Sequence, residues 1–278
     1  MGGQHTQETW DEERANAFEQ LQFLTRGESR VRIMECLSAS GSVTQRELRA
    51  QLTVSRTTVA RSLRSLEDRG WVRNSDNGAY RLTRAGTVIV SELSGLLETV
   101  QTVEELSEFL RWFPSDEFAP DFLNPSDVEV IVSSEGDPYA PAREQTDILR
   151  SADRLRIILP AVDLEGTKTL AEQVTDRGLE VETIVSPDVE ATIESGEFAS
   201  LLAEPLATER ARILAVDQEP PFYLGLADDG RVQIGVEDDE GFPRALLETS
   251  DEDIREWATD FYRTYRERAT HKPVAEFE

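Results

Sequence analysis

The stretch TQRELRAQLTVSRTTVARSLRSLEDRGWVRNSDNGAYRL, residues 44–82, carries the clearest local pattern of the chain. Thr44 and Glu47 have the spacing of a capping box, in which each side chain bonds the backbone N–H of the other residue at the start of a helix. Leu48 and Leu52 then fall on one face of that helix. The pattern therefore predicts a short amphipathic helix that begins after Thr44.

A second helix is predicted after a turn of only two residues, Thr53 and Val54. Ser55 is a favourable N-cap residue for it. Its apolar positions recur at helical spacing and define one buried face: Val59, Leu63 and Leu66. Gly70 is placed to end the helix, because the left-handed residue that follows a helix C-terminus is most often glycine.

The face of this second helix opposite the apolar stripe is basic and hydroxylated. At about 100° per residue, Thr57, Arg61 and Arg64 lie on that outer face, and Arg56 lies in the first turn. Arginine can donate two hydrogen bonds to a guanine edge, and threonine offers a hydroxyl and a methyl group. A helix with these side chains near its N-terminus suits the major groove of DNA.

Two strand patterns, residues 71–73 and 79–82, flank Asn77-Gly78, a dipeptide that favours a tight hairpin turn. With the two helices they predict a winged helix-turn-helix. Base or near-base contacts are expected from the first turns of the second helix, and backbone or wing contacts from Arg64, Arg73 and Arg81. The predicted DNA-binding set is Thr44, Ser55, Arg56, Thr57, Thr58, Arg61, Arg64, Arg73 and Arg81. The alternative is a small helical domain with ordinary solvated arginines.

Acidic side chains outnumber basic ones by 55 to 29, for a net charge of −26. Residues 1–100 carry 13 basic and 13 acidic groups, whereas residues 101–278 carry 16 basic and 42 acidic groups. Within residues 41–86, nine arginines accompany only four acidic residues. A chain this acidic should repel nucleic acid as a whole, yet the acidic charge is kept away from the segment predicted to bind it.

Lysine is scarce, because Lys168 and Lys272 are the only two lysines. Abundant acid, little lysine and modest apolar content resemble the composition of proteins from haloarchaea, which hold molar salt in the cytoplasm. At about 1 M salt the Debye length is about 3 Å, so long-range repulsion between this chain and DNA would be largely screened. An acidic nucleic-acid mimic or a disordered acidic tail fits less well, because the acids are interspersed with periodic apolar residues.

The sequence shows no apolar run long enough to span a bilayer and no charged-then-apolar leader, so a cytoplasmic protein without membrane attachment is expected. Cys36 is the only cysteine. An intrachain disulfide and a thiolate metal site are therefore excluded. Cys36 lies in an apolar helical pattern, where a small buried side chain is expected in preference to a redox sensor.

A long helical pattern covers residues 84–113. Its apolar residues recur as a near-heptad seam: Ile89, Leu93, Leu96, Val100, Val103, Leu106 and Leu110. Such a seam predicts either a dimer-forming helix or a linker helix buried on its own chain. In a homodimer, two recognition helices would meet successive major-groove faces about 34 Å apart. Pro114, Pro120 and Pro125 mark a boundary beyond the helix.

From Asp127 the pattern alternates between strands and helices. Residues 128–132, 155–159 and 179–185 are predicted strands joined by helices, which favours parallel pairing. Segments 212–216, 222–226 and 232–236 are predicted antiparallel strands, and residues 251–269 a final helix. The expected fold class is α+β or α/β. Its parts are a winged helix-turn-helix at 1–86, a linker and dimerisation helix at 87–126, and a mixed α/β domain for effector sensing or oligomerisation at 127–278.

Three longer stretches carry a family resemblance: PYAPAREQTDILRSADRLRIILPAVD, GLEVETIVSPDV and PPFYLGLADDGRVQIGVEDDEGFPRALLETSDEDIREWATDFYRTYRERA. They resemble the effector domain of archaeal FilR-type methanogenesis regulators, many of which occur in haloarchaea with an N-terminal winged helix. The resemblance covers residues 15–270. It implies a DNA-binding transcriptional regulator whose C-terminal domain senses an effector or dimerises. It carries over no ligand residues, and no residue points to methanogenesis itself.

In parallel sheets, ligands favour the carboxyl ends of the strands. Those ends place Ser133-Ser134, residues 160–163 and residues 186–188 around one possible crevice. We therefore predict that a small-molecule effector contacts Pro160, Asp163, Ser186 and Tyr223. Asp163, like Asp188, is equally suited to be a plain helix N-cap. The alternative function is an architectural or nucleoid-associated DNA-binding protein without a small-molecule ligand.

The sequence lacks the common motifs of enzyme active sites. The sequence has no Gly-x-Gly-x-x-Gly, no phosphate loop and no Gly-x-Ser-x-Gly. His5 and His271 are the only histidines. Related sensor domains of sugar-responsive archaeal regulators adopt a phospholipase D fold, but the required His-x-Lys with a spaced Asp is absent here. Residues 237–240 are acidic without the alternating spacing of a cation site. We expect no enzyme activity, no cofactor and no metal.

Overall fold

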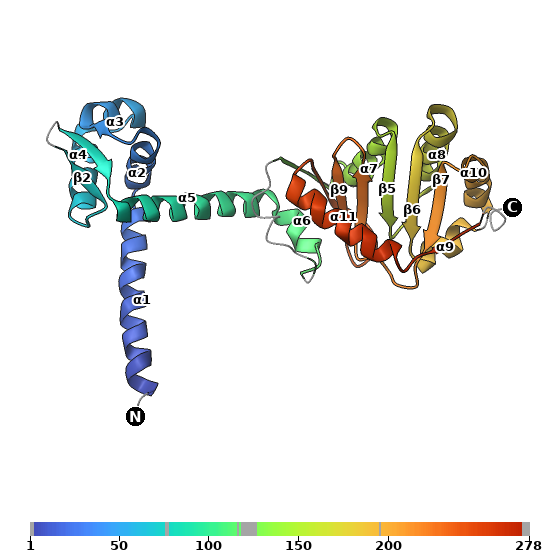
Figure 1. Ribbon diagram of the computed structural model, residues 1–278, viewed down its shortest axis with the longest axis horizontal. Coiled ribbons are helices and arrows are strands. Elements are labelled where there is room, and N and C mark those ends of the chain that lie inside the picture. Colours follow the sequence, from blue (N-terminus) through green and yellow to red (C-terminus); the bar gives the residue numbers. More distant parts are fainter. Residues whose placement is uncertain (1–2, 76–77, 116, 118–126, 195, 274–278) are drawn as a thin grey trace. The chain divides into compact units, whose positions relative to one another are not determined.

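The computed structural model describes residues 3–75, 78–115, 117, 127–194 and 196–273, with the backbone alone for residues 3–13. The chain divides into two compact units, Met1–Glu98 and Thr99–Glu278, called here the winged-helix unit and the C-terminal unit. The first holds a small sheet among helices, and the second holds a large mixed sheet with helices on both faces (Figure 1). The fold class expected from the sequence is confirmed.

The winged-helix unit contains the predicted helix-turn-helix and hairpin in the predicted order, together with a short strand, β1, that the sequence did not predict. Its elements are α1 (Gly3–Thr25), α2 (Glu28–Ser40), β1 (Val43–Thr44), α3 (Gln45–Leu52), α4 (Arg56–Glu67), β2 (Val72–Asn74), β3 (Ala79–Leu82) and the start of α5 (Arg84–Glu105). The strands form an antiparallel sheet in the order β1-β3-β2. Gly78 has the expected positive φ, +76°, and Asn77 lies outside the described residues.

A single apolar core joins the helices of this unit to its wing. Ile33, Leu48 and Leu63 come from α2, α3 and α4 and are fully buried. Gly86, in the first turn of α5, lies so close to the wing that a Cβ on it would be 2.0 Å from the Trp71 carbonyl oxygen. The winged-helix unit therefore depends on a backbone-to-backbone contact that only glycine permits.

The single helix predicted for residues 84–113 is wrong, because the structure interrupts it at Leu106. Helix α6 (Ser107–Trp112) follows separately. The apolar seam is shared among three environments, which explains the break. Ile89 and Leu93 pack in the winged-helix core, and Leu106 is buried in the C-terminal core. The middle of the seam stays exposed: Leu96, Val100 and Val103.

The C-terminal unit is built on an eight-stranded sheet with the order β11-β7-β6-β5-β8-β9-β10-β4. The strands are β4 (Val128–Val132), β5 (Arg154–Leu159), β6 (Glu180–Val185), β7 (Ala211–Ala215), β8 (Tyr223–Ala227), β9 (Val232–Glu237), β10 (Pro243–Thr249) and β11 (Thr270–His271). The helices after α6 are α7 (Ala140–Ser151), α8 (Leu164–Glu172) with the π-helical turn Gln173–Arg177, α9 (Pro187–Ile193), α10 (Gly196–Ala207) and α11 (Glu252–Arg266).

Two strand pairings differ from the prediction. β4 was expected to be parallel to β5, but it pairs antiparallel with β10 at the edge of the sheet. β10 itself is missing from the sequence prediction, and it supplies a partner for every residue of β4. β7 was placed in the antiparallel half, but it is parallel to β6. The helical segment α9–α10 between β6 and β7 explains this, because it returns the chain to the start of the sheet.

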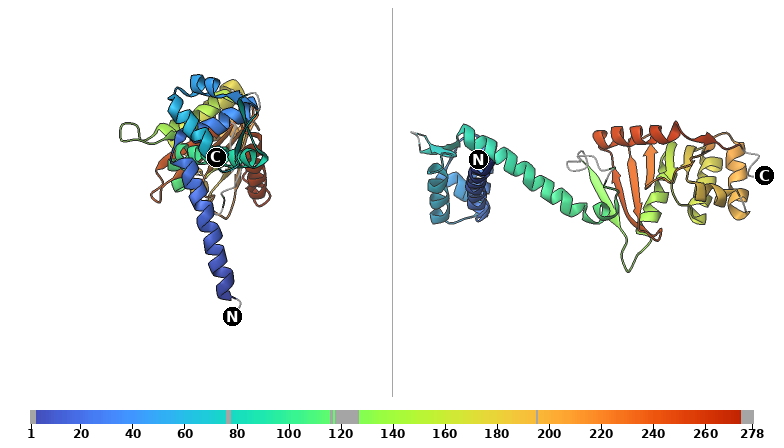
Figure 2. Two further views of the ribbon diagram at one scale, coloured as in Figure 1. Left: turned by 90° about the vertical axis from the view of Figure 1, so that its left-hand side faces the viewer. Right: turned by 90° about the horizontal axis from the view of Figure 1, so that it is seen from below.

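Helices cover the two faces of the large sheet unequally. α11 and α6 pack on one face, while α7, α8 and α10 pack on the other (Figures 1 and 2). Neighbouring strand residues serve opposite cores, since successive side chains point to opposite faces: Ile157 belongs to the α7–α10 core and Ile158 to the α11 core. Under α11 the rings of Phe222 and Phe261 stack with centroids 4.7 Å apart. A cavity lies on the α7–α10 face of the sheet and a groove on the α11 face.

Candidate DNA interface and effector site

The first helix of the helix-turn-helix is fixed by the predicted capping box. The Glu47 backbone N–H donates to Thr44 Oγ1 at 3.3 Å, and the Thr44 N–H donates to Glu47 Oε2 at 2.8 Å. Hydrogen bonds from the Thr44 backbone, and then from its hydroxyl, lower the pKa of the Glu47 carboxyl. Thr53 adopts a left-handed conformation with φ of +53°, which lets the chain turn directly into α4.

The start of α4 is fixed by Ser55. Its Oγ accepts the backbone N–H of Thr58 at 3.1 Å, and the two hydroxyls lie 2.8 Å apart. Of the predicted DNA-binding residues, Thr44, Ser55 and Thr58 thus have side chains engaged in hydrogen bonds at helix N-termini. In this structure these side chains fix the starts of α3 and α4.

The outer face of α4 carries the remaining predicted residues. Arg56, Thr57, Arg61 and Arg64 are exposed, opposite the buried apolar stripe. Among the described residues, the three arginine side chains form no ion pair or hydrogen bond. A guanidinium group without an internal partner keeps all its donors available for an external acceptor. α4 therefore presents a row of free cationic donors with one threonine among them.

The wing adds a second cationic feature. Arg73 on β2 and Arg81 on β3 are directly opposite each other in the register of the hairpin. Both are exposed, and neither has a carboxylate partner in the described part of the chain. Like charges directly opposite on a β-ladder are destabilising. An anion such as a DNA phosphate would relieve that repulsion.

Two exposed arginines of α3, Arg46 and Arg49, were missed by the sequence prediction. Their spacing of three was the available signal, since it puts them on neighbouring helix positions. Arg69, by contrast, belongs to the nine arginines of the basic segment but has a structural role. Its guanidinium lies 3.4 Å from the centroid of the Phe23 ring and donates to Gln20 Oε1 at 3.0 Å.

The C-terminal unit contains a cavity of about 90 Å³ between the sheet and its α7–α10 face. Its lining is mainly apolar, with Thr146, Thr167 and Thr183 among the polar members. Two of the four predicted effector residues, Asp163 and Tyr223, line it. Asp163 also caps α8 by accepting the Gly166 N–H at 2.9 Å, as the alternative interpretation expected.

The other two predicted effector residues support this region without lining the cavity. Ser186 is fully buried, and its hydroxyl donates to the Pro160 carbonyl oxygen at 3.1 Å while accepting the Val189 N–H at 3.2 Å. Ser133-Ser134 does not join them as expected. It follows β4, and strands β8, β9 and β10 separate β4 from β5.

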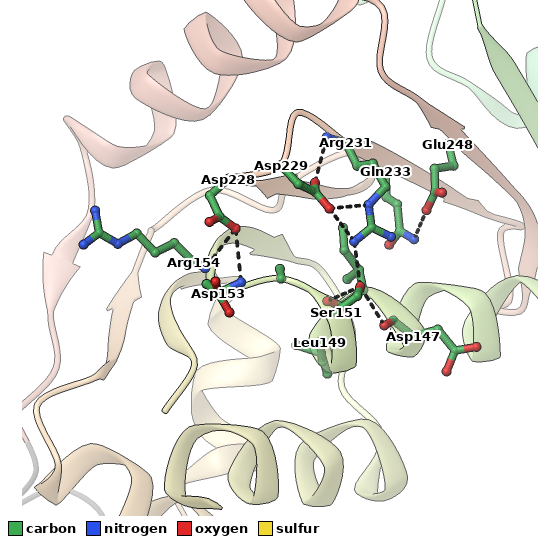
Figure 3. Close-up of polar contacts among 12 residues, drawn as sticks. Asp147, Leu149, Ser151, Asp153, Arg154, Asp228, Asp229, Arg231, Gln233 and Glu248 are labelled. Carbon is green, nitrogen blue, oxygen red and sulfur yellow. Dashed lines mark hydrogen bonds and ion pairs between the residues drawn. The ribbon is translucent and has the colours of Figure 1, made fainter. Parts of the chain in front are cut away.

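A chain of hydrogen bonds leads from Tyr223, at the cavity, through Gln233 to Glu248. Tyr223 lies over Gly225 and Gly235, where an added Cβ would come within 2.6 Å and 3.2 Å of it. Its hydroxyl donates to Gln233 Oε1 at 3.4 Å. Gln233 Nε2 in turn donates to Glu248 Oε2 at 2.7 Å (Figure 3). Burial, together with the Glu248 carboxylate, raises the pKa of Tyr223, so its hydroxyl stays neutral and remains a donor.

The hairpin between β8 and β9 is tied to the end of α7 (Figure 3). Asp228 Oδ1 accepts the backbone N–H groups of Asp153 and Arg154, each at 3.1 Å. The bond from Arg154 is the leading cause of the lowered pKa of Asp228. Arg231 donates to Ser151 Oγ at 2.6 Å and to Asp229 Oδ2 at 2.8 Å. The β8–β9 hairpin, which belongs to the third stretch quoted for the family resemblance, therefore has a structural role.

The described residues contain no group of three or more His, Cys, Asp or Glu side chains arranged to hold a metal ion. In the acidic turn at 237–240, Asp238 accepts the N–H groups of Glu240 and Phe242, each at 3.0 Å, and pairs with Arg244. His271 is exposed, and Lys272 pairs with Glu194 at 3.2 Å. No helix in the described ranges is long and apolar enough to cross a bilayer.

Comparison with protein families gives two matches, separated by residues 106–137. The family described as "HVO_A0261 N-terminal domain" matches residues 18–105. The family described as "Methanogenesis regulatory protein FilR1, middle domain" matches residues 138–268. The first covers the helix-turn-helix, the wing and α5, and the second covers most of the large sheet. A search among curated proteins gives no match.

Several solved structures are similar to this chain at low sequence identity. TrmBL2, described as an archaeal chromatin protein, has 16% identity and a TM-score of 0.42, over 91% of this chain and 99% of that one. Nuc from Salmonella typhimurium, a phospholipase D family member, has 13% identity and a TM-score of 0.40, over 53% and 99%. NucT from Helicobacter pylori has 14% identity and a TM-score of 0.39, over 52% and 99%.

Proposed function

We propose that this chain is a sequence-specific DNA-binding transcriptional regulator, and the two family matches, one of them to the middle domain of a regulatory protein, support an archaeal transcriptional regulator. The observation that carries the proposal is the outer face of α4, where exposed arginines and Thr57 have no partner in the described part of the chain. Arg56 and Arg61 would read base edges, and the wing pair Arg73 and Arg81 would hold phosphates. The function is binding and regulation, without a catalysed reaction.

This function is tested by chromatin immunoprecipitation of the tagged protein from cells of its own organism, which measures its occupancy across the genome. Sharp peaks that share a two-fold motif are expected, and Arg56→Ala with Arg61→Ala should remove them. Diffuse occupancy without a motif would favour an architectural role instead. A matched control is Arg143→Ala with Arg150→Ala, which removes two exposed arginines that pair with Asp137 and Asp147 in the C-terminal unit.

We further propose that the regulator is a homodimer through α5. Leu96 and Val100 are 55% and 50% exposed, although both belong to the apolar seam. With Val103 they form a stripe at steps of four and three, the spacing at which two copies of one helix can bury the same face against each other. A two-fold dimer would also match a pseudo-palindromic site.

Light scattering at several protein concentrations tests the dimer. Leu96→Glu with Val100→Glu should convert it to a monomer, because two carboxylates would be buried at the interface. Ser91→Glu with Gln101→Glu adds the same charge to exposed positions on the opposite side of α5 and should leave the dimer intact. A wild-type protein that is monomeric at all concentrations would overturn the dimer.

The C-terminal unit is proposed to sense a small molecule through the cavity that Asp163 and Tyr223 line. A volume of about 90 Å³ suits a small, largely apolar group, and Tyr223, whose hydroxyl is anchored to Gln233, forms part of its wall. A ligand at 100 times its Kd stabilises the folded state by about 2.7 kcal/mol. A thermal-shift screen with a metabolite panel should therefore find a compound whose effect is smaller on Tyr223→Phe. If no compound raises Tm, the sensing role is wrong.

A further inference from the structure

The face of the large sheet that carries α11 has a groove of about 880 Å³, separate from the cavity on the other face. Its floor is a cross-strand row in which Arg156 on β5, Glu182 on β6 and Arg212 on β7 are register partners. Since alternate residues share a face of a strand, Arg154 and Glu180 extend the floor by a second row. The floor thus presents guanidinium groups from neighbouring parallel strands.

One side of α11 forms the wall of this groove. Arg255, Thr259, Tyr262, Arg263 and Arg266 line it, at spacings that keep them on one face of a helix. Tyr262 joins wall and floor, since its hydroxyl donates to Glu182 Oε1 at 2.9 Å. Its ring also lies 6.0 Å from the guanidinium carbon of Arg156. The two sets of arginines therefore face one common space.

The charge of the groove is opposite to that of its surroundings. Seven arginines line it, against the four carboxylates of Glu180, Glu182, Glu209 and Asp228. The chain has only 16 basic residues beyond residue 100, against 42 acidic ones. Nearly half of the cationic groups in this strongly acidic region thus converge on one concave surface. A cleft of one sign concentrates the field and raises the local concentration of counter-ions.

Several of these arginines are not neutralised within the protein. Arg154 pairs with Glu180 at 3.2 Å, Arg266 with Glu182 at 2.6 Å, and Arg263 with Asp260 at 2.7 Å. Among the described residues, Arg156, Arg210, Arg212 and Arg255 form no ion pair. In addition, Arg255 Nη1 is buried and has no hydrogen-bond partner in the described ranges. A buried donor left unsatisfied costs free energy unless an acceptor reaches it.

The chemistry of the missing acceptor follows from these groups. Guanidinium forks bind phosphate oxygens through paired hydrogen bonds, and several of them around one space match several anionic groups held close together. A long nucleic acid fits less well, because the exposed side of α11 carries Glu256, Asp260 and Glu267, which would face its backbone. We propose that this groove binds a compact small molecule that carries two or three linked phosphate groups.

Calorimetric titration of the full chain with inorganic triphosphate tests this site. The buffer should contain about 1 M KCl, where the Debye length is about 3 Å and diffuse charge attraction is screened. Saturable binding to the wild type is expected, with at least a tenfold loss of affinity in Arg156→Gln with Arg212→Gln. Arg143→Gln with Arg150→Gln removes the same charge from paired, exposed arginines outside the groove and should bind normally.

Three results would overturn the assignment: no saturable binding by the wild type, an equal loss in both double variants, or wild-type affinity in the groove variant. Arg255→Gln gives a second check with little risk to the fold, and it should lower the affinity for triphosphate at unchanged Tm of the free protein. DNA affinity is measured in parallel. If the groove variant loses DNA affinity while triphosphate does not bind, the groove is a DNA contact. If the α4 variants do not affect DNA binding, the proposed DNA-binding role of α4 is wrong, but the proposal of a phosphate site in the groove still stands.

Discussion

The winged-helix unit and the C-terminal unit differ in how many of their exposed arginines are paired with carboxylates. On α4 and the wing, exposed arginines have no internal partner in the described part of the chain and lie on a unit whose acidic and basic charges balance. In the C-terminal unit many arginines are paired, as Arg143 with Asp137, Arg177 with Asp153 at 3.0 Å and Arg231 with Asp229. The unpaired arginines of α4 and the wing lie on the predicted DNA-binding surface, whereas the unpaired arginines of the C-terminal unit named above line the groove beside α11.

The difference extends to what lies beneath the arginines. α3, α4 and the wing are fixed by a capping box, by Ser55 and by the Gly86–Trp71 contact, so the free guanidinium groups start from a rigid scaffold. Preorganised donors lose less conformational entropy on binding. If this comparison is right, damage to the scaffold should affect DNA binding as strongly as loss of the arginines does.

The largest effect is expected from Gly86→Ala. Its Cβ would lie 2.0 Å from the Trp71 carbonyl oxygen and 2.9 Å from its carbon, both of which are backbone atoms. Forcing α5 away from the wing should cost about 3 kcal/mol or more of the free energy of unfolding of the winged-helix unit. Denaturant unfolding followed by tryptophan fluorescence measures the loss, and operator binding should fail in parallel.

Gly95→Ala is the matched control for that substitution. Gly95 lies in the same helix, and an added Cβ would meet nothing within 4 Å. Because alanine is the better helix former, this variant should gain up to about 1 kcal/mol of stability. Equal losses in both variants would show that the Trp71 contact is not what holds α5 to the wing.

The next effect concerns the recognition helix itself. Arg61→Ala removes an exposed guanidinium that has no partner within the described residues, so the fold should be unchanged. If Arg61 reads a base, operator affinity should fall by about 1–3 kcal/mol with relaxed specificity at one position. Titration of labelled operator variants measures both quantities. Arg150→Ala, which breaks a surface pair with Asp147, should leave them unchanged, and an unaltered affinity in Arg61→Ala at high salt would exclude a base contact.

The winged-helix unit was predictable from the sequence because its determinants are local. The capping box spans four residues, the hairpin spans about a dozen, and the apolar stripe of α4 repeats within two turns. Each signal can be recognised without knowing what else the segment packs against. The same locality identified the free arginines, since a helix face opposite a buried stripe is exposed whatever the rest of the chain does.

The C-terminal unit was less predictable because its determinants are far apart in the chain. β4 was assigned to the wrong partner because nothing local in Val128–Val132 reveals that β10 will lie beside it. The groove was missed for the same reason. Arg156, Glu182 and Arg212 alternate with apolar residues in three separate strands, and only the register of the sheet brings them into one row.

Some of the residues predicted for the effector site line the cavity, and others do not. The preference of ligands for strand carboxyl ends led to Asp163, which lines the cavity together with Tyr223, and their contact with an effector stays a prediction. Pro160 and Ser186 were placed near them but serve to hold the loop before α9. Ser133-Ser134 was wrong because the rule was applied to a strand that turned out to be antiparallel and at the edge.

A smaller effect, on the scaffold alone, is expected from Thr44→Ala. Loss of the N-cap should cost about 1 kcal/mol of stability, with a lesser decrease in operator affinity. The pKa of Glu47 is lowered in the folded state, so its bonds to Thr44 stabilise the protein above the unfolded pKa, and this contribution disappears as pH falls through the folded value. The difference between wild type and Thr44→Ala, measured by urea unfolding, should therefore narrow in acid. A constant difference would mean that Glu47 takes no part.

The smallest effect is expected from Arg73→Gln, which should change the stability of the free protein and its affinity for DNA in opposite directions. Arg73→Gln removes one of two like charges that oppose each other on the wing, so the free protein should gain a few tenths of a kcal/mol. The same substitution removes a phosphate contact, so DNA affinity should fall almost uniformly across sequences, with the salt slope reduced by about 1. Urea unfolding and salt-dependent titration measure the two changes independently. Opposite signs are expected because the repulsion in the free wing is relieved only when DNA is bound. A loss of both stability and affinity would show instead that Arg73 supports the wing, as the paired arginines support the C-terminal unit.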